Sequence, residues 1–140
     1  MWTNISEIYG RGENLLIDTD VLIWYLRGNE NARKIICANV PFKISVVSYI
    51  ELMQGTGSKR ELRALQKQLK NWATEIVQIQ DNISARAMFF VEDYYLGNSL
   101  EFQDAIIAAT AIESRDVLLT ANDKHYSFIP NIRLNRFRAR

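Results

Sequence analysis

The chain has 140 residues, of which 48% are hydrophobic and 24% are charged, with 17 Lys and Arg against 16 Asp and Glu. A chain of this length and composition folds as about one globular domain and is neither disordered nor fibrous. No apolar run approaches the roughly 18 residues of a membrane span, and a single cysteine and a single histidine exclude an intrachain disulfide and a Cys/His zinc cluster.

Residues 1–13 are polar and contain two glycines, so we expect them to form a loose N-terminal extension of a single domain that spans 1–140. They have no basic start followed by an apolar run, which excludes a secretory signal. With Cys37 as the lone cysteine, the chain fits a reducing cytosol, and we expect a cytoplasmic protein without membrane contact.

The next segment predicts one strand and two helices. Residues 15–18 (LLID) are a continuous apolar run that ends in an acid, as buried parallel strands do. Residues 21–26 fit a short helix capped by Thr19 or Asp20, and residues 30–38 fit a second helix.

The middle of the chain continues this alternation. Residues 42–47 are β-branched and predict a second strand, after which Ser48 opens a helix. Residues 58–72 have leucines at helical spacing with charges on the other face, which is typical of an amphipathic helix. Residues 74–79 alternate and predict a third strand.

The last third adds two helices and two strands. Residues 83–97 predict a helix that ends at Gly97, and the Ala- and Ile-rich residues 101–114 predict a largely buried helix. Residues 116–120 predict a fourth strand and residues 132–137 a short last one. The whole pattern predicts an α/β three-layer sandwich, with a small, mostly parallel sheet and helices on both faces.

Four acidic residues are expected at the strand ends of this sheet or in the first turn of the following helix: Asp18, Glu51, Asp104 and Asp123. The active site of such a fold lies beyond the carboxyl ends of the strands, so these side chains should converge in one cleft. Each acid also has a structural explanation, as a helix cap, a capping-box partner of Ser48, a helix-dipole partner or a turn residue. Their common location is what favours function.

Clustered carboxylates repel one another unless a cation neutralises them. Mg²⁺ takes oxygen ligands, commonly one or two carboxylates together with waters and substrate phosphates. A metal held in this way lowers the pKa of a bound water and stabilises charge on a phosphate in the transition state. The acidic cleft therefore predicts hydrolysis of phosphodiesters without a nucleophile from the protein.

Four motifs carry a resemblance to a known family: LLIDTDVLIWYL (15–26), ISVVSYIELMQG (44–55), LEFQDAIIAATA (100–111) and LLTANDKHY (118–126). In this order they resemble the PIN-domain ribonucleases, and in particular the VapC-type toxins of type II toxin–antitoxin pairs. The resemblance implies an endoribonuclease that depends on Mg²⁺ or Mn²⁺. It also implies a homodimer that is inhibited by a cognate antitoxin, whose C-terminal segment crosses the acidic cleft.

The same resemblance implies roles for single residues. Asp18 and Asp104 would be the main metal ligands, and Glu51 would complete the acidic site directly or through a water. At the fourth acidic position the motif points to either Asn122 or Asp123, and Asp123 has the better chemistry for a cation.

The candidates for contact with RNA are a hydroxyl and an amide of the fourth motif and two arginines of the basic segment 130–140: Thr120, Asn122, Arg133 and Arg136. Arginines suit phosphates and Phe137 suits stacking on a base, whereas a solvated tail is the alternative for this segment. His125 is either a general base or phosphate contact, or a solvated turn residue.

Adjacent aromatic residues on the helix over 83–97 predict a second apolar face. The pairs Phe89–Phe90 and Tyr94–Tyr95 cannot all point inward, because neighbours on a helix diverge by about 100°. We expect the outer face to meet a second subunit or an antitoxin.

Two other functions stay open at this point. A non-catalytic PIN-like module that binds RNA or protein would keep the fold and lose the acids. A haloacid-dehalogenase-like phosphatase would use the two acids of DTDVL (18–22), but TANDK (120–124) matches its downstream lysine and paired acids poorly.

Overall fold

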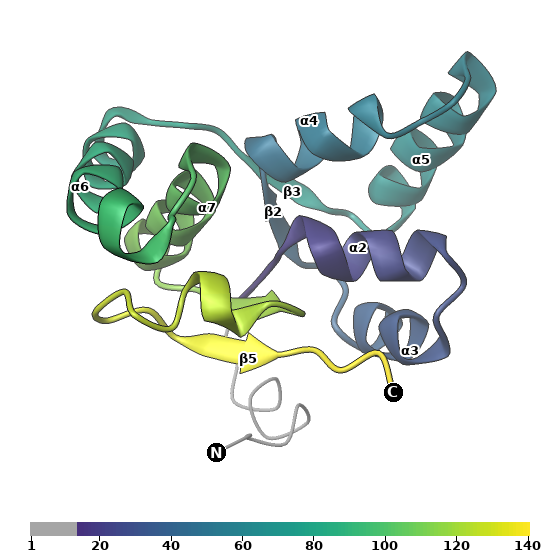
Figure 1. Ribbon diagram of the computed structural model, residues 1–140. Helices are drawn as coiled ribbons and strands as arrows, with labels where there is room; N and C mark the ends of the chain where they lie inside the picture. The colour runs from purple at the N-terminus through teal and green to yellow at the C-terminus, as the bar shows by residue number, and fades with distance from the viewer. Residues whose placement is uncertain (1–13) are drawn as a thin grey trace.

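The computed structural model describes residues 14–140, so the expected extension over 1–13 lies outside the described part. Five short strands form one sheet of parallel neighbours in the order β3-β2-β1-β4-β5 (Figure 1). The strands are β1 (Leu15–Ile17), β2 (Lys43–Ser45), β3 (Glu75–Val77), β4 (Val117–Thr120) and β5 (Leu134–Arg136). The helices are α2 (Thr19–Leu26), α3 (Glu30–Ala38), α4 (Val46–Gln54), α5 (Lys59–Asn71), α6 (Asp81–Asn98), α7 (Phe102–Glu113) and the short 3-10 helix η1 (Asp123–His125).

The layers confirm the predicted α/β sandwich. Side chains of β1 alternate between two hydrophobic clusters: in the first, Leu15 and Ile17 pack with side chains of α2, α3, α4 and α5, and in the second, Leu16 packs with side chains of α6 and α7. Figure 1 shows α6 and α7 on one side of the sheet and α2 to α5 on the other. β1 is the central strand, with β2 and β3 on one side and β4 and β5 on the other. The strand order therefore reverses at β1, and the crevice beyond the carboxyl ends of β1 and β4 is the expected place for an active site.

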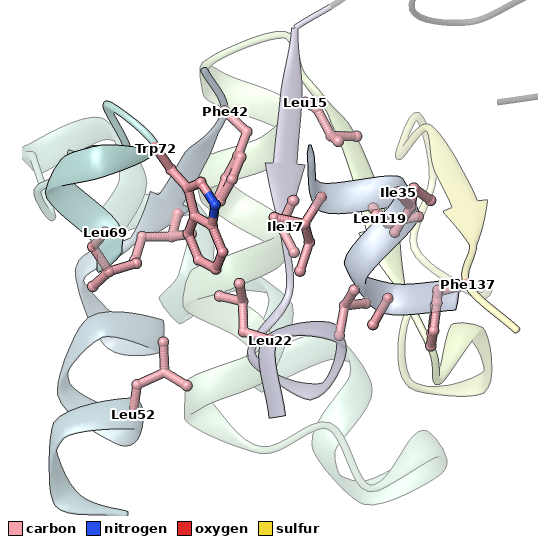
Figure 2. Close-up of a cluster of buried hydrophobic side chains, with 14 of the residues drawn as sticks. Leu15, Ile17, Leu22, Ile35, Phe42, Leu52, Leu69, Trp72, Leu119 and Phe137 are labelled. Carbon is pink, nitrogen blue, oxygen red and sulfur yellow. The ribbon is translucent and has the colours of Figure 1, made fainter. Parts of the chain in front are cut away.

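An aromatic group anchors the first cluster. Trp72 follows α5, is 8% exposed, and has its ring centroid 4.9 Å from Tyr25 and 5.6 Å from Phe42. Figure 2 shows it beside Leu69, next to Ile17 of the central strand. Full burial of a side chain of this kind stabilises a fold by about 1.5–3 kcal/mol. The cluster therefore holds two helices against the sheet: α2, which Asp18 caps, and α4, which carries Glu51.

Two predicted helix ends are wrong, and local backbone contacts decide both. The cap of α2 is Asp18 rather than Thr19 or Asp20, because the Asp18 carboxylate accepts the N–H of Thr19. Helix α6 runs through Gly97 to Asn98, and the capping residue Ser99 takes the left-handed conformation with φ 59°. Ser99 accommodates the helix end that we expected of glycine.

The start of α4 is a third correction. Strand β2 is shorter than predicted, and Ser45 caps the helix by accepting the N–H of Val47. Ser48 therefore lies inside α4 and is fully buried. Glu51 consequently lies beyond the first turn, and the capping box between Ser48 and Glu51 is wrong.

The segment 130–140 is part of the fold and not a solvated tail. In β5, Arg136 lies opposite Thr120 of β4. Phe137 is 4% exposed and belongs to the first cluster, so the predicted stacking of its ring on an RNA base is wrong. Among the described helices, none has the length and apolar character that crossing a membrane requires.

Candidate active site

Asp18 lies between β1 and α2, where three donors hold its carboxylate. Oδ1 accepts the N–H of Thr19 at 2.8 Å, and Oδ2 accepts the hydroxyls of Thr120 and Tyr126, both at 2.9 Å. The residue is only 6% exposed. Burial, followed by repulsion from Asp20, raises the pKa of Asp18 from 3.8 to about 7. Such a carboxylate is costly to ionise alone and would be stabilised by a nearby cation.

Asp104 lies in the first turn of α7, as predicted. Its Oδ1 is 3.2 Å from the hydroxyl of Tyr126, and its Oδ2 is 3.2 Å from Nδ1 of His125. Partial burial raises the pKa of Asp104 above its ordinary value, and His125 opposes the shift. Tyr126 therefore connects Asp104 to Asp18. The sequence did not assign Tyr126 to the site, and its only signal was the aromatic residue at the end of the fourth motif.

Glu51 approaches the same region from α4. Its Oε1 accepts the hydroxyl of Thr19 at 2.8 Å, which links α4 to the start of α2. Glu51, Asp104 and His125 also line one cleft of about 390 Å³, together with the loop over 98–101. The structure thus brings three of the four predicted acids to one region at the carboxyl edge of the sheet.

Asp20, predicted from the sequence as a helix cap, is a further acidic residue at this edge of the sheet. Its carboxylate accepts the N–H of Ala121 at 3.2 Å and contacts the hydroxyl of Thr120 at 3.3 Å. Burial raises the pKa of Asp20. The Thr120 hydroxyl also accepts the N–H of Asn122 at 3.0 Å, so the Asp20–Thr120 contact orders the loop after β4.

The fourth acidic position differs from the other three. Asp123 begins η1, and its Oδ1 lies 3.6 Å from Nε of Arg136. The carboxylate of Asp123 therefore faces the guanidinium group of Arg136 in β5. Asn122 instead extends its amide to Nε2 of His125 at 3.2 Å. Arg133 lies before β5 and donates to the backbone carbonyl of Arg115.

The donor set suits a hard divalent cation. Among residues 14–140, no group of three or more His, Cys, Asp or Glu side chains forms a ready metal cage. Mg²⁺ and Mn²⁺ need only one or two carboxylates when water and phosphate complete the shell. Asp18 and Asp104 supply two carboxylates joined through one hydroxyl, and both have pKa values raised by burial. The residues present therefore fit the implied metal.

The chain is similar in sequence and fold to known proteins. The PIN domain family matches residues 15–129. A toxin–antitoxin complex from Klebsiella pneumoniae contains a similar chain, with 28% identity, a TM-score of 0.73, and coverage of 85% of this chain and 95% of that one. DNA-bound VapBC from Salmonella typhimurium gives 18% identity, a TM-score of 0.76, and coverage of 89% and 98%. FitAcB from Neisseria gonorrhoeae gives 19% identity, a TM-score of 0.69, and coverage of 87% of this chain and 96% of that one.

Among curated proteins, none matches the chain. The family match covers the strands and helices that carry Asp18, Glu51 and Asp104. It therefore leaves the haloacid-dehalogenase-like alternative without support. The chain belongs to the PIN domain family.

Proposed function

We propose that the protein is a Mg²⁺- or Mn²⁺-dependent endoribonuclease and the toxic component of a toxin–antitoxin pair. The observation that carries this proposal is the meeting of Asp18 and Asp104 at one hydroxyl, with Glu51 in the adjoining cleft. A non-catalytic module would have no use for buried acids whose ionisation burial opposes.

The residues divide the chemistry between them. A bound divalent ion would activate a water and stabilise the charge on the phosphate. Asp18 and Asp104 would hold that ion, and Glu51, oriented by the Thr19 hydroxyl, would accept a proton at Oε1. Hydrolysis would break the bond between phosphorus and the 3′ oxygen, leaving a 3′-hydroxyl and a 5′-phosphate. The protein itself would form no covalent bond to the substrate.

RNA would run along the carboxyl edge of β4 and β5. Two polar side chains of this edge are the proposed substrate contacts, Asn122 and Arg136. Thr120, predicted from the sequence as a contact, is fully buried and its hydroxyl contacts Asp18 and Asp20 instead. Arg133, also predicted as a contact, precedes β5 and lies beside Arg115 at the opposite, amino edge of the sheet. An arginine guanidinium group donates to phosphate oxygens, while an amide group fixes the strand by single hydrogen bonds. Asp123 would act at this edge by orienting Arg136, and we therefore place it beside the substrate rather than on the metal.

An antitoxin would inhibit the enzyme by covering the acidic cleft. A groove of about 670 Å³ runs between α2, α4 and α5, with Leu26, Leu52 and Leu65 among its apolar side chains and Glu51 at its margin. An apolar segment of the antitoxin seated there would reach the acids directly. An antitoxin as the partner is supported by the solved toxin–antitoxin complexes that contain chains similar to this one.

A homodimer would cover the outer face of α6. Leu96 is 93% exposed, and other large apolar side chains of α6 and the start of α7 are more than half exposed: Met88, Phe89, Tyr95 and Phe102. Exposed apolar patches of this kind mark association surfaces. The toxin would act in the cytoplasm, where its RNA substrates lie.

The test is cleavage of labelled RNA by the purified chain with Mg²⁺ or Mn²⁺, and with EDTA as the metal-free condition. Asp104→Asn keeps the size of the side chain and removes its charge, so we expect it to abolish cleavage without lowering the unfolding temperature. Asp93→Asn, on an exposed position of α6, is the matched control and should cleave normally. Cleavage by Asp104→Asn at the wild-type rate would show that the site is wrong.

A further inference from the structure

We propose that Tyr126 is a positioning residue for the metal, because its hydroxyl holds the two main carboxylate ligands together. This inference rests on the metal dependence proposed above. The hydroxyl oxygen lies 2.9 Å from Oδ2 of Asp18 and 3.2 Å from Oδ1 of Asp104. The two acids come from opposite sides of the sheet, one at the start of α2 and one on α7.

Tyr126 is itself held rigidly. The residue is fully buried and its ring packs in the second cluster with Leu118 and Ile129. Its N–H donates to the carbonyl of Asp123 at 3.0 Å, and its carbonyl accepts the N–H of Ile129 at 2.9 Å. The position of the hydroxyl is therefore set by the turn η1 and by the core, and it does not depend on the two carboxylates.

Other contacts of the acids do not perform the same role. Thr120 contacts Asp18 and Asp20, and His125 contacts Asp104. Tyr126 contacts both of the proposed main ligands. Two neighbouring carboxylates repel each other unless a group between them offsets the repulsion. The single hydrogen of the Tyr126 hydroxyl can bond to the carboxylate of Asp18 or to that of Asp104. Outer partners that orient metal ligands commonly contribute about 10–100-fold to metal affinity.

The experiment measures Mn²⁺ binding by titration calorimetry, independently of any cleavage. Tyr126→Phe removes only the hydroxyl and keeps the buried ring, so the fold should be retained. We expect Mn²⁺ affinity to fall by about tenfold, while cleavage at saturating Mn²⁺ recovers most of the wild-type rate. Tyr49→Phe is the matched control, because its hydroxyl accepts an exposed hydrogen bond from Gln66, outside the site. It should bind Mn²⁺ as the wild type does.

A spectroscopic readout completes the test. Addition of Mn²⁺ should change the near-ultraviolet tyrosine absorbance of the wild type and of Tyr49→Phe, and this change should be absent in Tyr126→Phe. Equal Mn²⁺ affinity of Tyr126→Phe and wild type would overturn the role of Tyr126 and leave the proposed function intact. Failure of the wild type to bind Mn²⁺ would overturn the metal dependence itself, and this inference with it.

Discussion

Replacing Asp18 by Asn should flatten the dependence of stability on pH in the metal-free chain. The folded chain binds the proton of Asp18 more tightly than the unfolded chain does, because folding raises its pKa from 3.8 to about 7. The stabilising contribution is therefore complete below about pH 4 and is lost as the pH rises through about 7. Asp18 should therefore contribute least to the free energy of unfolding of the wild type at alkaline pH.

The magnitude follows from the two pKa values. Linkage gives a loss of about 3 kcal/mol in the free energy of unfolding between about pH 5 and pH 8. The residue is 6% exposed, so water screens little of this contribution. Asn has the same shape, still accepts the N–H of Thr19 as a helix cap, and does not ionise. The variant should therefore keep the fold and lose this part of the pH profile.

The assay is urea unfolding across that pH range in EDTA, for the wild type, Asp18→Asn and the exposed control Asp93→Asn. The difference between wild type and Asp18→Asn should grow by about 3 kcal/mol toward alkaline pH, with the variant the more stable there. The control should follow the wild type. Parallel profiles of wild type and Asp18→Asn would refute the link between burial of this carboxyl and stability.

Three further predictions concern the core, a helix cap and the dimer. Trp72→Ala should lower the free energy of unfolding by about 3–5 kcal/mol in denaturant titrations, because it empties the centre of the first cluster; a loss comparable to a surface change would contradict that role. Ser45→Ala should cost about 1 kcal/mol through the lost cap of α4, measured in the same way. Leu96→Glu should convert a dimer to monomers in analytical ultracentrifugation, with stability changed by no more than about 0.5 kcal/mol; a persistent dimer would exclude this face.

Local signals predicted some elements closely. Helix α3 has the predicted residues, because Asn29 caps it and its apolar face repeats at helical spacing. The start of α4 was missed because Ser45 and Ser48 are equally good caps. Only the packing that buries Ser48, and its contact with the Thr19 hydroxyl, decides between them. That packing comes from residues far apart in the chain.

The candidate site shows the same division. Asp18 and Asp104 could be predicted because acids at strand ends and helix starts have a defined place in a parallel sheet. The direction of a turn side chain has no such rule, so the pairing of Asp123 with Arg136 required the structure. Tyr126 could not be predicted for another reason. A buried aromatic residue normally belongs to the core, and its hydroxyl contacts Asp18 and Asp104, which are distant from it in the sequence.

The site also lies along a seam between the two halves of the core. Asp18 and Glu51 lie with the layer of α2 and α4, whereas Asp104 and Tyr126 lie with the layer of α6 and α7. An ion shared between Asp18 and Asp104 would then act as a cross-link between the layers, with the sheet as the hinge line. Loss of the ion would weaken the packing of both layers on the sheet, so the form of the protein that cleaves RNA would also be its most stable form.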